Sequence, residues 1–80
     1  MVSYLLSNKI SGEPKDVDVS ENFVLVLDNT NIHVFSLMGI HLSSTKVEGY
    51  TENKKIAVLE PFVYLNDVED WEPIVYKIES

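Results

Sequence analysis

The sequence predicts an all-β fold, either a small barrel or a two-layer sandwich of about five to six mostly antiparallel strands built on a hairpin over residues 22–42. Valine and isoleucine are abundant, whereas Ala57 is the single alanine in the chain. Branched side chains fit the pleated surface of a sheet, and alanine is the residue that helices favour. Turn residues recur at roughly eight- to twelve-residue intervals, which is typical of short consecutive strands. The alternative is an α+β fold with one short helix within residues 53–59 or 66–71.

The hairpin is the longest organised stretch of the chain. Two apolar runs flank the polar residues Asp28 to Asn31, whose composition is typical of a turn. The run Phe23–Leu27 is apolar at every position, so we expect a central strand covered on both faces. The expected register pairs Leu27 with Ile32, Leu25 with Val34 and Phe23 with Ser36, and leaves Val24, Val26, His33, Phe35 and Leu37 on the opposite face.

Shorter strands are expected on either side of the hairpin. Residues Val2–Leu6 predict a first strand, and residues 16–20 predict a short edge segment that leads into the hairpin. Gly39 predicts a bulge, or a bend of one long strand into a second layer. Residues 43–45 predict a turn, and residues 46–50 predict an edge strand at best.

The last third of the chain alternates in two places. Residues 54–65 predict one strand with a kink or bulge at Glu60–Pro61, because a proline ring would break a helix there. Residues 66–71 predict one helical turn, which an asparagine or aspartate can cap. The final segment, residues 74–79, alternates apolar and polar residues and predicts a half-exposed last strand.

Length and composition bound the class of protein. Eighty residues form one domain, residues 1–80, close to the lower size limit for a single hydrophobic core. The chain has no cysteine, no basic start followed by a long apolar run, and no stretch of about 18 apolar residues of the kind that crosses a membrane. We therefore expect a cytoplasmic protein that does not bind membranes.

The net charge of −7 points to the chemistry of the partner. All six basic residues are lysines, so the chain lacks the planar arginine fork that grips phosphate through two bonds. A polyanion would be repelled, and we expect no direct binding of nucleic acid. Acidic surfaces suit basic partners, which makes another protein with a basic surface the expected partner.

Catalytic chemistry has little support in the sequence. Cysteine is absent, no glycine-rich loop is present, and Ser43–Ser44 lacks the strand–turn–helix setting of a hydrolase serine. His33 and His41 would lie roughly 26 Å apart along an unbent strand, so a shared zinc site requires the chain to fold back at Gly39. We expect two structural or surface histidines, and neither an enzyme nor a cofactor or metal site.

The candidate partner-binding residues are acidic. In residues 66–73, four carboxylates surround a tryptophan, a residue type that is enriched among interface hot spots. Along a strand, carboxylates two residues apart lie about 6.6 Å apart, so a D-x-D sequence can imitate successive phosphates. The candidate contacts are Asp67, Glu69, Asp70, Trp71, Glu72, Asp16 and Asp18. The alternative for Trp71 is that it closes the core.

These observations predict a small acidic protein-binding module, in its sharper form an inhibitor or immunity-type protein that occupies a basic surface of a nucleic-acid-acting partner. The alternative is a structural or assembly subunit that forms homo-oligomers through apolar strands. The uniformly apolar run Phe23–Leu27 motivates the alternative, because so short a chain has little material to cover both of its faces.

Overall fold

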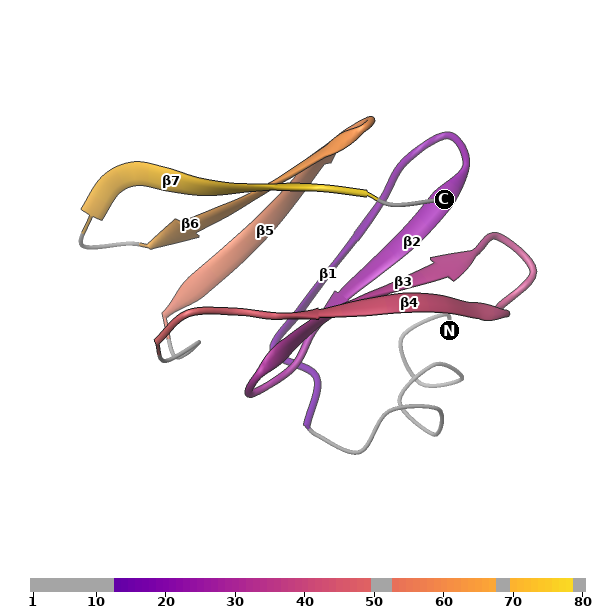
Figure 1. The fold of residues 1–80 in the computed structure, drawn as a ribbon, viewed down its shortest axis with the longest axis horizontal. Coiled ribbons are helices and arrows are strands. Elements are labelled where there is room, and N and C mark those ends of the chain that lie inside the picture. The colour runs from indigo at the N-terminus through magenta and orange to yellow at the C-terminus, as the bar shows by residue number, and fades with distance from the viewer. Residues whose placement is uncertain (1–12, 50–52, 68–69, 79–80) are drawn as a thin grey trace.

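The computed structural model describes residues 13–49, 53–67 and 70–78, and over these residues the fold is all-β. Seven strands occur in this part of the chain: β1 (Asp16–Val19), β2 (Phe23–Leu27), β3 (Asn31–Ser36), β4 (His41–Lys46), β5 (Lys54–Leu59), β6 (Phe62–Asp67) and β7 (Asp70–Lys77). They form a four-stranded sheet of order β1-β2-β3-β4 and a three-stranded sheet of order β5-β6-β7, each antiparallel throughout (Figure 1).

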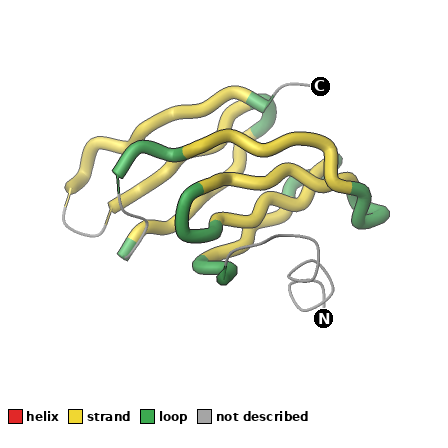
Figure 2. Tube along the Cα trace, turned by 60° about the horizontal axis from the view of Figure 1, so that its bottom comes forward, coloured by secondary structure: helices red, strands yellow, loops and turns green. Residues whose placement is uncertain are grey.

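The prediction of an all-β fold is confirmed, and the sandwich describes it better than the barrel does. Two separate sheets face each other and do not close into one, so the barrel alternative is wrong (Figure 2). The described residues contain no helix, and therefore none long and apolar enough to cross a membrane. The short helix allowed within 53–59 or 66–71 is absent from the described residues of these segments, which form strands apart from Asn53 in a turn. The expected first strand, Val2–Leu6, lies outside the described residues.

The central hairpin forms as the sequence predicts. Strand β2 lies between β1 and β3, and it pairs with β3 in the expected register, Leu27 with Ile32, Leu25 with Val34 and Phe23 with Ser36. Asp28 N–H donates to the carbonyl of Asn31 at 2.9 Å, which closes the turn. The expected edge segment at residues 16–20 is β1, which pairs with β2.

The core lies between the sheets, and one sheet is also buried on its other face. The main cluster draws buried side chains from both sheets: Leu25, Leu27, Ile32, Val34, Val47, Ile56, Val63, Leu65 and Ile78. A second cluster, on the opposite face of the four-stranded sheet, consists of Val24, Val26 and Phe35. Burial on both faces explains why β2 shows no alternation of apolar and polar residues.

The chain after β3 differs from the prediction. A turn at residues 37–39, with Gly39 at φ 87°, brings β4 back beside β3 in the same sheet, so no long strand bends into a second layer. The bulge predicted at Gly39 is therefore wrong as well, although the β3–β4 ladder has a register shift elsewhere, between Val34 and Phe35. Residues 43–45 lie in β4 and not in a turn. Of the edge strand expected at 46–50, the described residues are 46–49, and among these Lys46 alone is in a strand. An exposed strand needs no apolar face, so the polar residues 43–45 can form a strand although their composition is typical of a turn.

The last three strands also contain one more turn than expected. The predicted kink at Glu60–Pro61 is a hairpin turn with a cis peptide bond, and it divides residues 54–65 between β5 and β6. Strand β7 begins at Asp70, four residues before the predicted start, and includes Pro73. Proline is tolerated there because β7 is an edge strand of its sheet.

Candidate functional site

The described part of the acidic segment predicted around Trp71 belongs to the β6–β7 hairpin. Asp67 ends β6 and pairs in register with Asp70 at the start of β7, and Glu72 is exposed. Glu69 and the side chains of Asp70 and Trp71 lie outside the described part of the structure. This hairpin end lies at the opposite end of the sandwich from the β3–β4 turn in both views (Figures 1 and 2).

Asp16 and Asp18, the other predicted contacts, hold the two sheets together. Both are half-buried, and their register partners Leu27 and Leu25 place them on the inner face of β1. The Asp16 carboxylate accepts a hydrogen bond from the N–H of Ile56 at 2.9 Å, and the Asp18 carboxylate accepts one from Val58 at 2.8 Å. Their contact with a partner stays a prediction, beside this structural role.

We call this contact, made by Asp16 and Asp18 with the N–H groups of Ile56 and Val58, the seam. Carboxylates two residues apart on β1 match donors two residues apart on β5, because both strands have the same repeat. At one end of the seam, the Asn22 side chain donates to the Glu60 carboxylate at 3.1 Å. The seam therefore satisfies backbone donors that the edge strand β5 would otherwise leave unpaired.

Strand β4 forms an edge of a different kind. Among the described strands it pairs with β3 alone, and five of its six residues are exposed. Val47 N–H donates to the carbonyl of Thr30 at 2.8 Å, so the alternation of an antiparallel ladder turns the N–H and C=O groups of Ser44 and Lys46 away from β3. We call this strand, His41–Lys46, the open edge.

Exposed apolar side chains lie beside the open edge. The β3–β4 turn and the start of β4 expose Met38 at 87%, Ile40 at 62%, Leu37 at 56% and Leu42 at 48%. We call these four residues the apolar turn. The sequence from Asn29 to Thr45 contains no Asp, Glu, Lys or Arg, so the one charged residue of this hairpin is Lys46 at the end of β4. Contiguous exposed apolar residues of this kind mark interaction sites.

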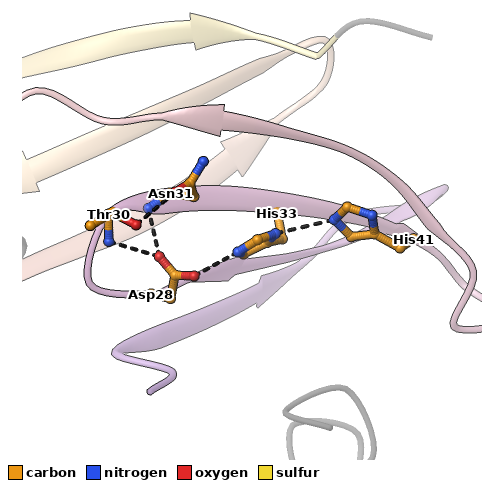
Figure 3. A network of polar contacts seen from close by, with 5 residues as sticks. All are labelled: Asp28, Thr30, Asn31, His33 and His41. Atoms are coloured by element: carbon orange, nitrogen blue, oxygen red, sulfur yellow. Dashed lines mark hydrogen bonds and ion pairs between the residues drawn. The ribbon is translucent and has the colours of Figure 1, made fainter. Parts of the chain in front are cut away.

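A polar network leads from the open edge into the four-stranded sheet (Figure 3). His41 on β4 lies against the ring of buried Phe35, with ring centroids 5.0 Å apart, and its Nε2 is 3.1 Å from Nδ1 of His33. Nε2 of His33 is 2.6 Å from a carboxylate oxygen of Asp28. The other Asp28 oxygen accepts hydrogen bonds from the N–H groups of Thr30 and Asn31 at 2.8 and 2.6 Å.

The ionised Asp28 determines which nitrogen of His33 donates. Burial would raise the pKa of Asp28, but the hydrogen bond from His33, those from Thr30 and Asn31, and the charge of His33 together hold it below its ordinary value. An ionised carboxylate only accepts, so the Nε2 of His33 carries a hydrogen and donates it. In neutral His33 the Nδ1 then carries a lone pair, which accepts a hydrogen bond from the Nε2–H of His41.

This arrangement can hold or pass a proton between exposed His41 and buried Asp28. A buried carboxylate that orients a histidine is also part of hydrolase triads, but here the third position holds a second histidine. No serine or threonine among the described residues hydrogen-bonds to either ring. Within the same residues, no group of three or more His, Cys, Asp or Glu side chains could hold a metal ion.

Sequence reasoning missed Asp28 and the open edge. The available signal was Gly39, since a glycine turn between two histidines eight residues apart folds one strand beside the other and can pair their rings. Asp28 at the head of the turn was a second signal, because aspartate accepts hydrogen bonds from the backbone two and three residues on.

The sequence matches no protein-family model, and no curated protein or solved structure matches it. The class of protein therefore has to be inferred from the geometry of the described residues. They form an all-β two-sheet domain with one edge closed by the seam and one open edge beside the apolar turn.

Proposed function

We propose that this protein is a protein-binding module that takes an extended segment of a basic partner protein along the open edge, with the apolar turn as the hydrophobic anchor. The observation that carries the proposal is the exposure of β4 together with the outward direction of the backbone groups of Ser44 and Lys46. An added strand gains affinity from backbone hydrogen bonds and specificity from alternate side chains.

The other described edges are less suited to strand addition. Strands β1 and β5 face each other across the seam, where the carboxylates occupy two N–H groups of β5. Strand β7 includes Pro73, which lacks the donor that a ladder needs. Natural sheets use inward charges and proline to block edge pairing, and β4 has neither within its six residues apart from the terminal Lys46.

Charge argues for a basic partner. The net charge of −7 repels a second copy of the chain and attracts a cationic protein. Complementary charge of this kind raises the rate of association. The β6–β7 hairpin, which carries the predicted acidic contacts Asp67 and Glu72, ends at the opposite end of the sandwich from the β3–β4 turn, so these contacts would steer a large partner without touching the segment on β4 (Figure 1). Inhibition of a nucleic-acid-acting protein is the sharper form of this proposal.

A second candidate is an assembly subunit in which β4 pairs with β4 of another copy. The exposed apolar side chains of Met38 and Ile40 favour it, because self-pairing would cover them. Light scattering at micromolar concentration separates the two candidates. The binding module is a monomer on its own, whereas the assembly subunit is a dimer that the substitution Ser44→Pro converts to a monomer.

The test of the binding module is a selection of short random peptides displayed against the full chain. We expect enrichment of segments that alternate apolar residues and carry Lys or Arg. Ser44→Pro removes one outward N–H and should weaken the selected peptides by about tenfold or more. The matched variant Ser44→Ala keeps that N–H and should bind normally. Enrichment of acidic or helical peptides, or equal binding by both variants, contradicts the proposal.

A further inference from the structure

We infer that His33 and His41 form a binding site for a divalent transition-metal ion, with Nδ1 of His33 and Nε2 of His41 as its two protein ligands and Asp28 as the supporting carboxylate. This inference is independent of the proposed function, because it rests on the network inside the β2–β3–β4 sheet and not on the backbone of the open edge. Imidazole nitrogen is a preferred ligand of Zn²⁺, Cu²⁺ and Ni²⁺.

The distance between the two nitrogens suits a shared ion. Ligand nitrogens at the usual distance from zinc lie about 2.9 Å apart at a right angle and about 3.4 Å apart at the tetrahedral angle. Nδ1 of His33 and Nε2 of His41 are 3.1 Å apart, between these two values. The ring centroids are 5.3 Å apart and the ring planes are tilted by 52°, so the rings do not stack, and a small rotation of exposed His41 would aim both nitrogens at one ion.

The surroundings of His33 match the support that metal-binding histidines usually have. Its second nitrogen, Nε2, donates to the Asp28 carboxylate, which fixes the ring and leaves Nδ1 as the lone pair. Asp28 is held in turn by the N–H groups of Thr30 and Asn31 and is only 2% exposed. Such a carboxylate also makes the imidazole a stronger ligand.

His41 supplies access and the second ligand. It is exposed, and its ring lies against Phe35 at an interplanar angle of 66°, which fixes its direction. To bind an ion, neutral His41 moves its hydrogen from Nε2 to Nδ1, so neither ring has to lose a proton overall. The ion replaces the hydrogen bond between the rings (Figure 3).

The site is open. Asp28 faces the other nitrogen of His33, and the described residues form no group of three or more His, Cys, Asp or Glu side chains that could hold an ion, so water completes the coordination when the protein is alone. An ion held in this way keeps coordination positions that are occupied by exchangeable water on the side of β4. Two imidazole ligands favour Cu²⁺ over Zn²⁺ by the usual order of affinities, and they exclude a Mg²⁺ or Ca²⁺ site, which needs oxygen ligands.

The test titrates Zn²⁺ into the full, chelator-treated chain and follows heat and the ¹⁵N shifts of the histidine rings. We expect one Zn²⁺ per chain, with the largest shifts at Nδ1 of His33 and Nε2 of His41, and no competition by excess Mg²⁺. His41→Gln should weaken Zn²⁺ at least tenfold, and Asp28→Asn should weaken it about tenfold to a hundredfold.

Two controls keep the result decisive. His41 is exposed, so His41→Gln leaves the fold in place, which circular dichroism checks. The exposed acidic residue Glu21 lies between β1 and β2, so Glu21→Gln reports adventitious binding to the acidic surface and should leave Zn²⁺ affinity unchanged. Absence of Zn²⁺ binding, equal affinity in His41→Gln, or shifts at the opposite ring nitrogens would overturn the inference.

Discussion

The seam and the open edge both lie at edges of the sheets, but their backbone groups have different partners. At the seam, aspartates on β1 reach inward and occupy N–H groups of β5, so two edges close on each other. At the open edge, β4 has Lys46 as its one charged residue, and the N–H and C=O groups of Ser44 and Lys46 point outward. Both edges have strand N–H and C=O groups that need partners, and among the described residues the seam supplies such partners whereas β4 pairs with β3 alone.

The difference teaches that acidic residues in a strand are not by themselves a binding surface. The spacing of Asp16 and Asp18 suits imitation of phosphates, but the same spacing also matches the N–H groups of a neighbouring strand, and the fold uses it that way. Strand β4 carries little charge and little apolar alternation, and it is the strand that remains available for pairing.

The largest expected effect is on the seam. Replacing Asp16 and Asp18 together by alanine leaves the N–H groups of Ile56 and Val58 without their acceptors, so we expect the free energy of unfolding to fall by about 3 kcal/mol. Urea denaturation measures it. The exposed residue Glu21 provides the control, since Glu21→Ala should change the stability by less than about 0.5 kcal/mol. Equal effects would mean that the seam does not hold the sheets together.

The polar network is expected to contribute somewhat less. Asp28→Asn keeps the shape of the side chain but loses the charged acceptor for His33, so we expect the free energy of unfolding at pH 7 to fall by about 2 kcal/mol. Urea denaturation in chelator-containing buffer measures this change without a metal contribution. An unchanged midpoint would show that the network is not coupled to folding.

The same substitution gives a prediction for acid. The folded pKa of Asp28 is below its ordinary value of 3.8, so its contribution is fully present above that value and is lost as the pH falls below it. The wild-type chain should therefore lose stability below this pH more steeply than Asp28→Asn does. Urea midpoints at a series of pH values test this, and parallel curves for the two proteins would contradict it.

At the open edge, the expected effect on folding is smaller still. Ser44→Pro removes an N–H that points away from β3, so we expect a loss of about 1 kcal/mol or less, in contrast to proline inside a sheet. Thermal unfolding compared with Ser44→Ala isolates the effect of the ring. A loss as large as that of the double aspartate variant would show that β4 is not a free edge.

The smallest effect on stability is expected at the apolar turn. Met38→Ser and Ile40→Ser replace exposed side chains, so each should change the stability by less than about 0.5 kcal/mol. Binding of peptides selected on the wild-type chain should nevertheless weaken. Normal binding by the double variant Met38→Ser/Ile40→Ser would remove the apolar turn from the proposed interface.

Much of the fold could be predicted because its central hairpin combines a polar turn with two apolar arms. The register followed from pairing Leu27 with Ile32, and burial on both faces followed from the unbroken run in β2. Strand β4 could not be predicted, because an exposed edge strand needs no apolar face and its residues resemble a turn. The two hairpin turns at Gly39 and Pro61 were each read as a bend within one strand.

The candidate site was harder to predict because it depends on pairing across strands. His33 and His41 are eight residues apart, and only the return of β4 beside β3 brings their rings within 3.1 Å. The structural role of Asp16 and Asp18 depends on β5, which lies 40 positions further along the chain. Local patterns carry no information about such distant partners.

Amide hydrogen exchange of the free protein tests the contrast between the two edges most directly. The amides of Ile56 and Val58, whose N–H groups donate to Asp16 and Asp18, should be protected. Those of Ser44 and Lys46 should exchange at rates close to those of an unfolded chain, because they point away from β3. Protected amides at Ser44 and Lys46 in the monomer, or unprotected amides at Ile56 and Val58, would contradict the account.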